Sequence, residues 1–321
     1  MKRDDLHRDL LQALEEKIPE QTKLVETLKD ILFMEKGAIY RRLRGEVPFT
    51  FFEVVNIAEK LDVSLKKIIH TDFVQVEHCE LPFIEYGNMS EIDYKQWEDY
   101  TSLISSAKDD PQSELAESSN ILPVSIYAKF DSLSKYYLFK YQYLLSESED
   151  RVSFSDMVVP DRLRQTYRSY FDASKNFANT IYIWDNLIFQ YLVTDIRFFS
   201  DIKLISTDDF RGIRKDLLAL LDYVEEIAFH GCFKETGNPV SFYISDINFD
   251  ADYSYMQINN IHVSHVRAFI LNTAGSTDES SFRKMKNWIH SLKKSSTLIS
   301  QSGAAFRAEF FEKQRKMISE L

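Results

Sequence analysis

The chain has 321 residues, of which 44% are hydrophobic and 28% charged, so it has the composition of a folded protein that buries a large core. Its net charge of −11 argues against a general nucleic-acid coat protein, and its 2 cysteines exclude a disulfide scaffold and suit a reducing cytoplasm. No stretch approaches the roughly 18 uninterrupted apolar residues that a membrane span needs, so we expect a cytoplasmic protein without a membrane partner.

Residues 1–72 are predicted to form a compact bundle of short helices. Apolar residues recur there at helical spacing, and the run is punctuated by residues that begin or end helices. This pattern indicates five helices, over residues 4–17, 21–33, 36–44, 50–61 and 62–69.

Local signals fix the ends of the third and fourth of these helices. Gly45 and Pro48 are expected to end the third helix, because glycine suits a left-handed cap and proline cannot continue a helix. Thr50 stands three residues before Glu53, which is the pattern of a capping box at the start of the fourth. The apolar stripe of the fourth helix is predicted to comprise Phe51, Val54, Val55, Ala58 and Leu61.

Residues 73–89 lose the helical period and contain a proline and a glycine, so we expect a junction there and a second, larger domain over 90–321. Most of that domain has helical periodicity, and 108–120 has the composition of a polar loop. Helices are predicted over 90–107, 133–148, 160–177, 183–202, 208–231, 280–300 and 303–320. Strands are predicted over 240–250, 252–258 and 261–271. The expected fold class is therefore mainly α, with a small antiparallel β-meander near residues 240–271.

The stretch KGAIYRRLRGE, residues 36–46, concentrates four basic side chains in an acidic protein. On a helix Ile39 and Leu43 share one face and can anchor it, which leaves three cations and a phenol elsewhere. Such a helix fits a DNA major groove, where Arg can bond guanine and Lys or Tyr can reach phosphates. Charge alone favours an ordinary solvated face, because residues 1–70 hold 13 basic and 13 acidic residues.

The run IYRRLRGEVPFTFFEVVNIAEKLDVSLKKII resembles the second half of the lambda-repressor/Cro-like helix-turn-helix family. Arg44-Gly45 stands where that family has a basic-Gly pair, and the resemblance covers residues 22–70 at most. The apolar-x-x-Ile-Ala-x-x-Leu-x-Val-Ser-Leu pattern is matched in register by Val54, Ile57, Ala58, Leu61, Val63, Ser64 and Leu65. The turn departs from the pattern, because no glycine precedes the recognition helix.

The resemblance implies a sequence-specific transcriptional regulator that binds operator DNA as a homodimer through residues 35–44. By the same resemblance, Lys36, Tyr40 and Arg41 would contact bases or backbone, and Arg44 and Thr50 would contact phosphates. Arg42 could serve either purpose, because it borders the buried face. The alternative is a protein–protein interaction module whose basic helix docks an acidic partner without binding DNA.

The larger domain has no recognisable catalytic pattern. It lacks a glycine-rich phosphate loop, a G-x-S-x-G elbow and an H-E-x-x-H pair, so we expect neither an enzyme nor a cofactor. His78, Cys79, His230 and Cys232 could supply zinc ligands, but their spacing fits no known zinc site, so no metal is expected. We expect this domain to dimerise the protein, to sense a small-molecule or protein effector, or to do both.

Overall fold

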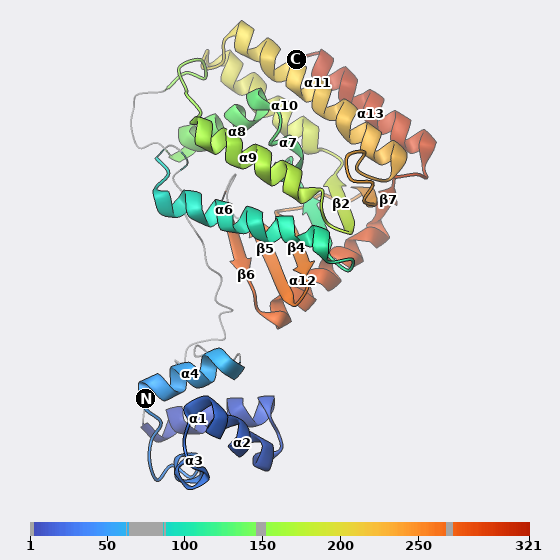
Figure 1. Ribbon diagram of the computed structural model, residues 1–321. Helices are drawn as coiled ribbons and strands as arrows, with labels where there is room; N and C mark the ends of the chain where they lie inside the picture. The colour runs from blue at the N-terminus through green and yellow to red at the C-terminus, as the bar shows by residue number, and fades with distance from the viewer. Residues whose placement is uncertain (1–2, 62, 64–85, 87, 146–151, 268–271) are drawn as a thin grey trace. The chain divides into compact units, whose positions relative to one another are not determined.

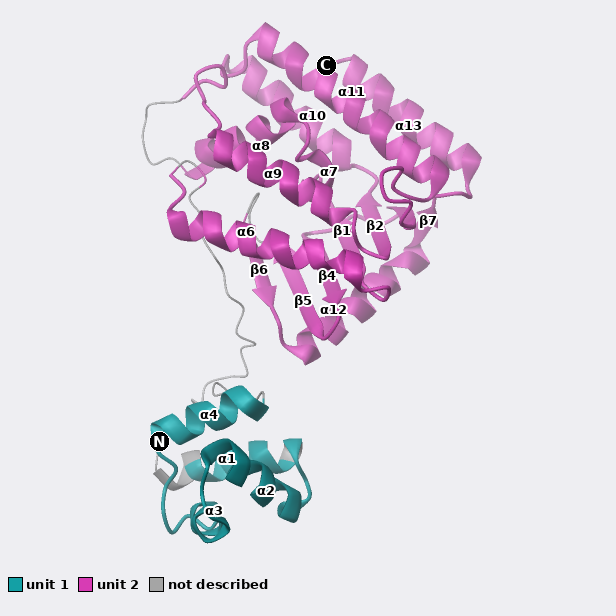
Figure 2. Ribbon diagram, viewed as in Figure 1, with its two compact units in different colours: residues 1–76 teal, residues 77–321 magenta. Residues whose placement is uncertain are grey.

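The structure is a computed structural model that describes residues 3–61, 63, 86, 88–145, 152–267 and 272–321. The chain divides into two compact units, Met1–Val76 (unit 1) and Glu77–Leu321 (unit 2) (Figure 2). The predicted junction over 73–89 lies mostly outside the described residues. Among the described helices, none combines the length and the apolar character required to cross a membrane.

The described part of unit 1 is helical (Figure 1). Its helices are α1 (Arg3–Lys17), α2 (Gln21–Leu32), α3 (Lys36–Leu43) and α4 (Phe51–Leu61). They enclose one apolar core, which includes Leu10, Leu14, Leu24, Val25, Leu28, Ile39, Ile57 and Val63. These helices coincide closely with the first four predicted ranges, whereas the predicted fifth helix lies outside the described residues apart from Val63.

The predicted apolar stripe of α4 is wrong at its first position. Phe51 is 83% exposed, while Glu53 and Ile57 are the buried residues of this helix. A polar residue therefore faces the core at the first turn of α4, and the phenylalanine beside it faces solvent.

Unit 2 is an α/β structure, with strands and helices alternating along much of the chain (Figure 1). Its strands are β1 (Glu114–Ser119), β2 (Asn179–Asp185), β3 (Val240–Ser245), β4 (Asp252–Ile258), β5 (Ile261–Arg267), β6 (Thr273–Ser276) and β7 (Ser296–Leu298). Its α-helices are α6 (Glu91–Ser105), α7 (Val124–Tyr127), α8 (Asp131–Leu145), α9 (Asp161–Ser174), α10 (Ile188–Asp201), α11 (Thr207–His230), α12 (Glu279–Leu292) and α13 (Ala304–Ser319). Two 3₁₀ helices, η1 (Ser106–Asp109) and η2 (Lys293–Ser295), complete the described elements.

The described strands form one seven-stranded mixed sheet in the order β6-β5-β4-β1-β2-β3-β7. The central strands β1, β2 and β3 are parallel, and the outer strands pair antiparallel. One face of the sheet packs on α12, and most of the other helices lie on the opposite face, where the largest apolar core forms (Figure 1).

The predicted fold class, mainly α with a small β-meander near 240–271, is therefore wrong. β1 lies in the predicted polar loop, and β2 overlaps the start of the predicted helix 183–202. The expected neighbours β3 and β4 are separated in the sheet by β1 and β2. The true meander is β4-β5-β6, which reaches Ser276.

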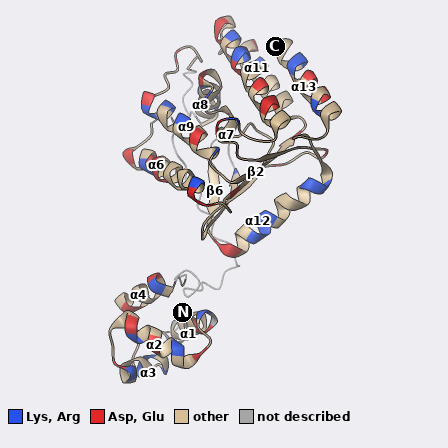
Figure 3. Cartoon of the chain, turned by 45° about the vertical axis from the view of Figure 1, so that its right-hand side comes forward, with Lys and Arg blue, Asp and Glu red and all other residues tan. Residues whose placement is uncertain are grey.

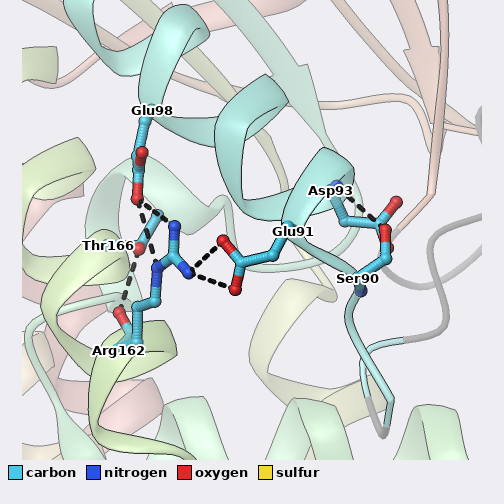
Figure 4. Close-up of polar contacts among 6 residues, drawn as sticks. All are labelled: Ser90, Glu91, Asp93, Glu98, Arg162 and Thr166. Atoms are coloured by element: carbon cyan, nitrogen blue, oxygen red, sulfur yellow. Dashed lines mark hydrogen bonds and ion pairs between the residues drawn. The ribbon is translucent and has the colours of Figure 1, made fainter.

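Helix α6 is tied to the rest of unit 2 by an arginine on α9 (Figure 4). Ser90 begins α6 with a capping box, in which its hydroxyl accepts from Asp93 N and its own N–H donates to the Asp93 carboxylate. Arg162 on α9 lies 2.8 Å from Glu91 Oε2 and 3.0 Å from Glu98 Oε1. One guanidinium thus bridges two turns of α6, which fixes the alignment of the two helices.

Candidate nucleic-acid interface

Helix α3 is anchored on unit 1 by its apolar side. Ile39 is fully buried and Leu43 packs against the same core, which includes Leu28 of α2 and Ile57 of α4. The residues on the other side of α3 are consequently turned towards solvent, as the helical spacing of the sequence predicted.

Backbone hydrogen bonds end α3 after Leu43. Arg44 N donates to Tyr40 O at 3.0 Å, and Gly45 N donates to Arg42 O at 2.9 Å. Gly45 has a φ of +74°, in the left-handed region that favours glycine. The prediction that Gly45 ends this helix is therefore confirmed.

Glu53 joins α3 to α4 from a buried position. Its Oε2 accepts from Thr50 N at 2.8 Å, and Thr50 Oγ1 accepts from Glu53 N at 3.3 Å, which confirms the predicted capping box. The same carboxylate receives two hydrogen bonds from Arg42, from Nε at 3.0 Å and from Nη2 at 2.8 Å. Arg42 is thus occupied within unit 1, although the sequence named it as a candidate DNA contact.

The pKa of Glu53 lies below its ordinary value of 4.5. Burial alone would raise this pKa, but the hydrogen bonds from Arg42 and Thr50 outweigh it because they favour the ionised carboxylate. A lowered pKa in the folded state means that Glu53 stabilises unit 1 above its unfolded-state pKa, and that this contribution is lost as the pH falls through the folded-state value.

We therefore expect the stability difference between the wild type and Glu53→Gln to be largest near neutral pH and to shrink as the pH falls below about 4.3. Thermal unfolding followed by circular dichroism at 222 nm, over a pH series, measures this difference. Glu46→Gln, which changes an exposed carboxylate, is the control and should show a smaller effect. A difference that stays constant down to acidic pH would contradict the prediction.

The exposed side of α3 presents Lys36, Tyr40 and Arg41, and Arg44 follows at its end. Lys36 is paired with Glu26, which raises the Lys36 pKa, and both side chains are about half exposed. Among the residues that the structure describes, Arg41 has no carboxylate within ion-pair distance.

Arg44 pairs with Glu46, with its Nε 2.7 Å from Oε1. Thr50 is exposed, and although its oxygen caps α4, its hydroxyl hydrogen can still be donated.

Carboxylates therefore balance much of the positive charge on this surface, which the sequence alone did not reveal. Exposed ion pairs of this kind contribute little to stability, so a phosphate could displace Glu26 or Glu46 at little cost. Arg41 needs no such exchange, which makes it the cation best placed to meet an incoming ligand.

The turn between α2 and α3 uses a phenylalanine where the family pattern has glycine. Phe33 adopts a left-handed φ of 51°, its N–H donates to Lys29 O, and its side chain is 94% exposed. The missing glycine thus does not prevent the turn, although a left-handed non-glycine residue costs roughly 1–2 kcal/mol.

The proposed metal ligands do not assemble among the described residues. No group of three or more His, Cys, Asp or Glu suited to a metal occurs there, and Cys232 is a free thiol. His78 and Cys79 lie outside the described residues.

His262 and His265, three residues apart on β5, face opposite sides of the strand. His262 stacks on Phe282 of α12, whereas His265 contacts Tyr100 of α6. Burial lowers the pKa of His265 to about 4.

Unit 2 also contains a buried ion pair that sequence reasoning missed. Arg267 Nε, at the end of β5, lies 3.0 Å from Asp252 Oδ2, at the start of β4. Asp252 Oδ1 accepts hydrogen bonds from Asn120 N at 2.7 Å and from Ile121 N at 3.3 Å. The carboxylate therefore joins the ends of three neighbouring strands, β1, β4 and β5.

Comparisons of the chain with protein-family models, with curated proteins and with solved structures find no match.

Proposed function

We propose that unit 1 binds double-stranded DNA sequence-selectively and that the protein is a transcriptional regulator that acts as a homodimer. The observation that carries the proposal is Arg41, an exposed guanidinium beside Tyr40 on a helix whose other side is held in a core. An arginine so placed can bond guanine O6 and N7 in the major groove, which is the commonest specific contact between proteins and DNA.

The remaining residues of the surface are assigned by their surroundings. Lys36 and Tyr40 would contact bases or backbone, and Arg44 and Thr50 would donate to phosphates, with Glu26 and Glu46 released from their pairs. Arg42 is assigned to the fold because Glu53 already holds it.

Two copies of the protein would read paired half-sites, because α3 has only 8 residues and one copy reads few bases. In such a dimer the two α3 helices would lie on the order of 34 Å apart, about one turn of DNA. Unit 2 would supply the dimer contact, respond to a small-molecule or protein effector, or do both.

Arg41→Ala should weaken binding to a preferred duplex by about 1–3 kcal/mol, which is roughly a tenfold to hundredfold loss of affinity, and should relax selectivity at the base it contacts. The preferred duplex is obtained by selection from a random library with the full chain, and affinities are measured by gel shift at low salt. Lys60→Ala is the matched control, because it removes one charge from an exposed lysine of α4.

An unchanged affinity for Arg41→Ala, or an equal loss for Lys60→Ala, would contradict the assignment of Arg41. Absence of duplex binding by the wild type at low salt would overturn the proposal itself.

A second candidate function is supported by the same charge balance. A surface on which Lys36 and Arg44 already pair with carboxylates, with Phe33 fully exposed in the adjoining turn, also suits a protein partner. A partner captured with all DNA digested, and lost after charge reversal at Arg41 and Arg44, would favour this function.

A further inference from the structure

The helix α12 packs against one face of the sheet of unit 2, and its apolar side is buried there. Phe282, Ile289 and Leu292 are 3%, 0% and 4% exposed and pack on strands of the sheet. Blue basic positions recur along α12, and its red acidic positions are confined to its start (Figure 3).

This segment is strongly basic within an acidic protein. From Glu279 to Ser295 it contains 5 Lys and Arg residues and a single acidic residue, whereas the chain as a whole has a net charge of −11. Basic residues gathered on one helix and the turn after it are a common electrostatic footprint of a polyanion site.

Two of these cations serve the fold. Lys286 Nζ lies 2.8 Å from Glu114 Oε1, and Lys293 Nζ lies 5.6 Å from the centre of the Tyr243 ring. Both contacts attach α12 and the following η2 to the sheet, so we do not assign these two lysines to a ligand.

Two other cations face outwards. The Arg283 side chain is 70% exposed; its Nε donates to Glu279 O at 3.4 Å and lies 3.8 Å from Glu279 Oε1, both on the preceding turn. Lys294 is exposed and has no ion-pair partner among the described residues. Between them lies Trp288, which is 50% exposed. Arg283 and Lys294 are 11 residues apart, which corresponds to roughly 16 Å along a helix.

The burial of α12 identifies the kind of polyanion. A helix that binds a membrane surface must insert its apolar side, and the apolar side of α12 is already in the core. A nucleic-acid backbone requires only exposed cations at intervals, and a duplex presents about one negative charge per 1.7 Å of its axis. The separation of Arg283 and Lys294 therefore spans several phosphates.

We propose that α12 makes a second, sequence-independent contact with the phosphate backbone of duplex DNA. This inference rests on the proposed function of unit 1, because it takes the duplex of that function as the ligand of α12. Even two cations then add measurably to affinity and to its dependence on salt.

The test is a salt titration with the full chain and a fluorescently labelled duplex, from about 50 to about 200 mM salt. In the double variant Arg283→Gln/Lys294→Gln, the slope of log affinity against log salt should become shallower by about one for each lost phosphate contact, so by about two. The affinity at low salt should fall roughly tenfold or more, for preferred and unrelated duplexes alike. The double variant Lys313→Gln/Lys316→Gln is the matched control, because it removes two charges from exposed lysines of α13.

An unchanged slope, or an equal change in the α13 control, would overturn the inference. The inference would also be overturned if the double variant Arg283→Gln/Lys294→Gln lost binding to poly-glutamate but kept its duplex affinity. The partner of α12 would then be an acidic protein. Tryptophan fluorescence of both variants confirms that unit 2 is folded.

The outcomes separate this inference from the function proposed for α3. If the wild type binds all duplexes alike and the α12 variant still shows a shallower slope, the selective function fails and the inference stands. If selective binding persists with an unchanged slope, only the inference fails. If the wild type binds no duplex at low salt, both fail.

Discussion

Arg42→Ala is expected to lower the free energy of unfolding of unit 1 by about 3 kcal/mol. The Arg42 and Glu53 side chains are only 14% and 9% exposed, so the substitution leaves a buried carboxylate without its cation. A domain of some 70 residues has roughly 4–10 kcal/mol of stability in total, so this loss would be a large fraction of it. The DNA binding proposed for unit 1 would then also fall, because α3 would lose its support.

The exposed pair of Arg44 and Glu46 provides the matched control. Its closest contact, 2.7 Å, is as short as the 2.8 Å between Arg42 and Glu53, but its side chains are 59% and 49% exposed. Burial is the main difference between the pairs, and Arg44→Ala should therefore be much less destabilising than Arg42→Ala.

The positions of the tryptophans allow the two units to be followed separately. Trp97, Trp184 and Trp288 all lie in unit 2, so tryptophan fluorescence reports unit 2 alone, while circular dichroism at 222 nm reports both. In urea, Arg42→Ala should shift part of the circular dichroism transition to lower concentration and leave the fluorescence transition unchanged. A shift in fluorescence alone, or no shift at all, would contradict the role given to Arg42.

The sequence predicts unit 1 well where its signals are local. The ends of α3 and α4 are encoded within a few residues, by Gly45 and by the pair Thr50 and Glu53. The ion pair of Arg42 with Glu53 spans 11 residues and depends on how α3 packs on α4, so helical spacing could only place Arg42 at the border of the buried face.

β1, a central strand of the sheet of unit 2, was not predicted because its polar side chains are satisfied by residues of other elements. In β1, Glu117 accepts from Ser125 at 2.6 Å, and Ser118 Oγ donates to Tyr253 O at 3.3 Å. The parallel partner of β1 begins at Asn179, 65 residues after Glu114. A sequence of glutamate, alanine and serine therefore resembles a loop until its neighbours are known.

The pairing of charges at the candidate interface likewise depends on contacts between different helices. Helical spacing predicted that four side chains of this surface are exposed, and the structure confirms it for Lys36, Tyr40, Arg41 and Arg44. The partner of Lys36, however, is Glu26 on the preceding helix, which no pattern in the basic stretch indicates. The sequence gives the balance of charge in residues 1–70, but which cations on this surface are paired depends on the positions of both helices.

Asp252→Ala is expected to destabilise unit 2 by about 3–5 kcal/mol. The side chains of Arg267 and Asp252 are 12% and 7% exposed, and Arg267 Nη1 is already buried without a hydrogen-bond partner among the described residues. Removal of the carboxylate would leave the guanidinium uncompensated and the N–H groups of Asn120 and Ile121 without their acceptor.

Asp252→Asn separates these two effects, because the amide oxygen can still accept from Asn120 and Ile121 while the charge is lost. Urea unfolding followed by tryptophan fluorescence should rank the wild type above Asp252→Asn, and Asp252→Asn above Asp252→Ala. Asp250→Ala, an exposed aspartate two residues earlier, is the control and should change stability by less than about 0.5 kcal/mol.

The double variant Asp252→Asn/Arg267→Leu decides whether the charge pair is responsible. Removal of both charges leaves no buried ion unpaired, so the double variant should be less destabilised than the sum of its single variants, with a coupling of about 1–3 kcal/mol. Strict additivity would mean that the two residues stabilise unit 2 independently, and the ends of β4 and β5 would then be held by backbone pairing rather than by this ion pair.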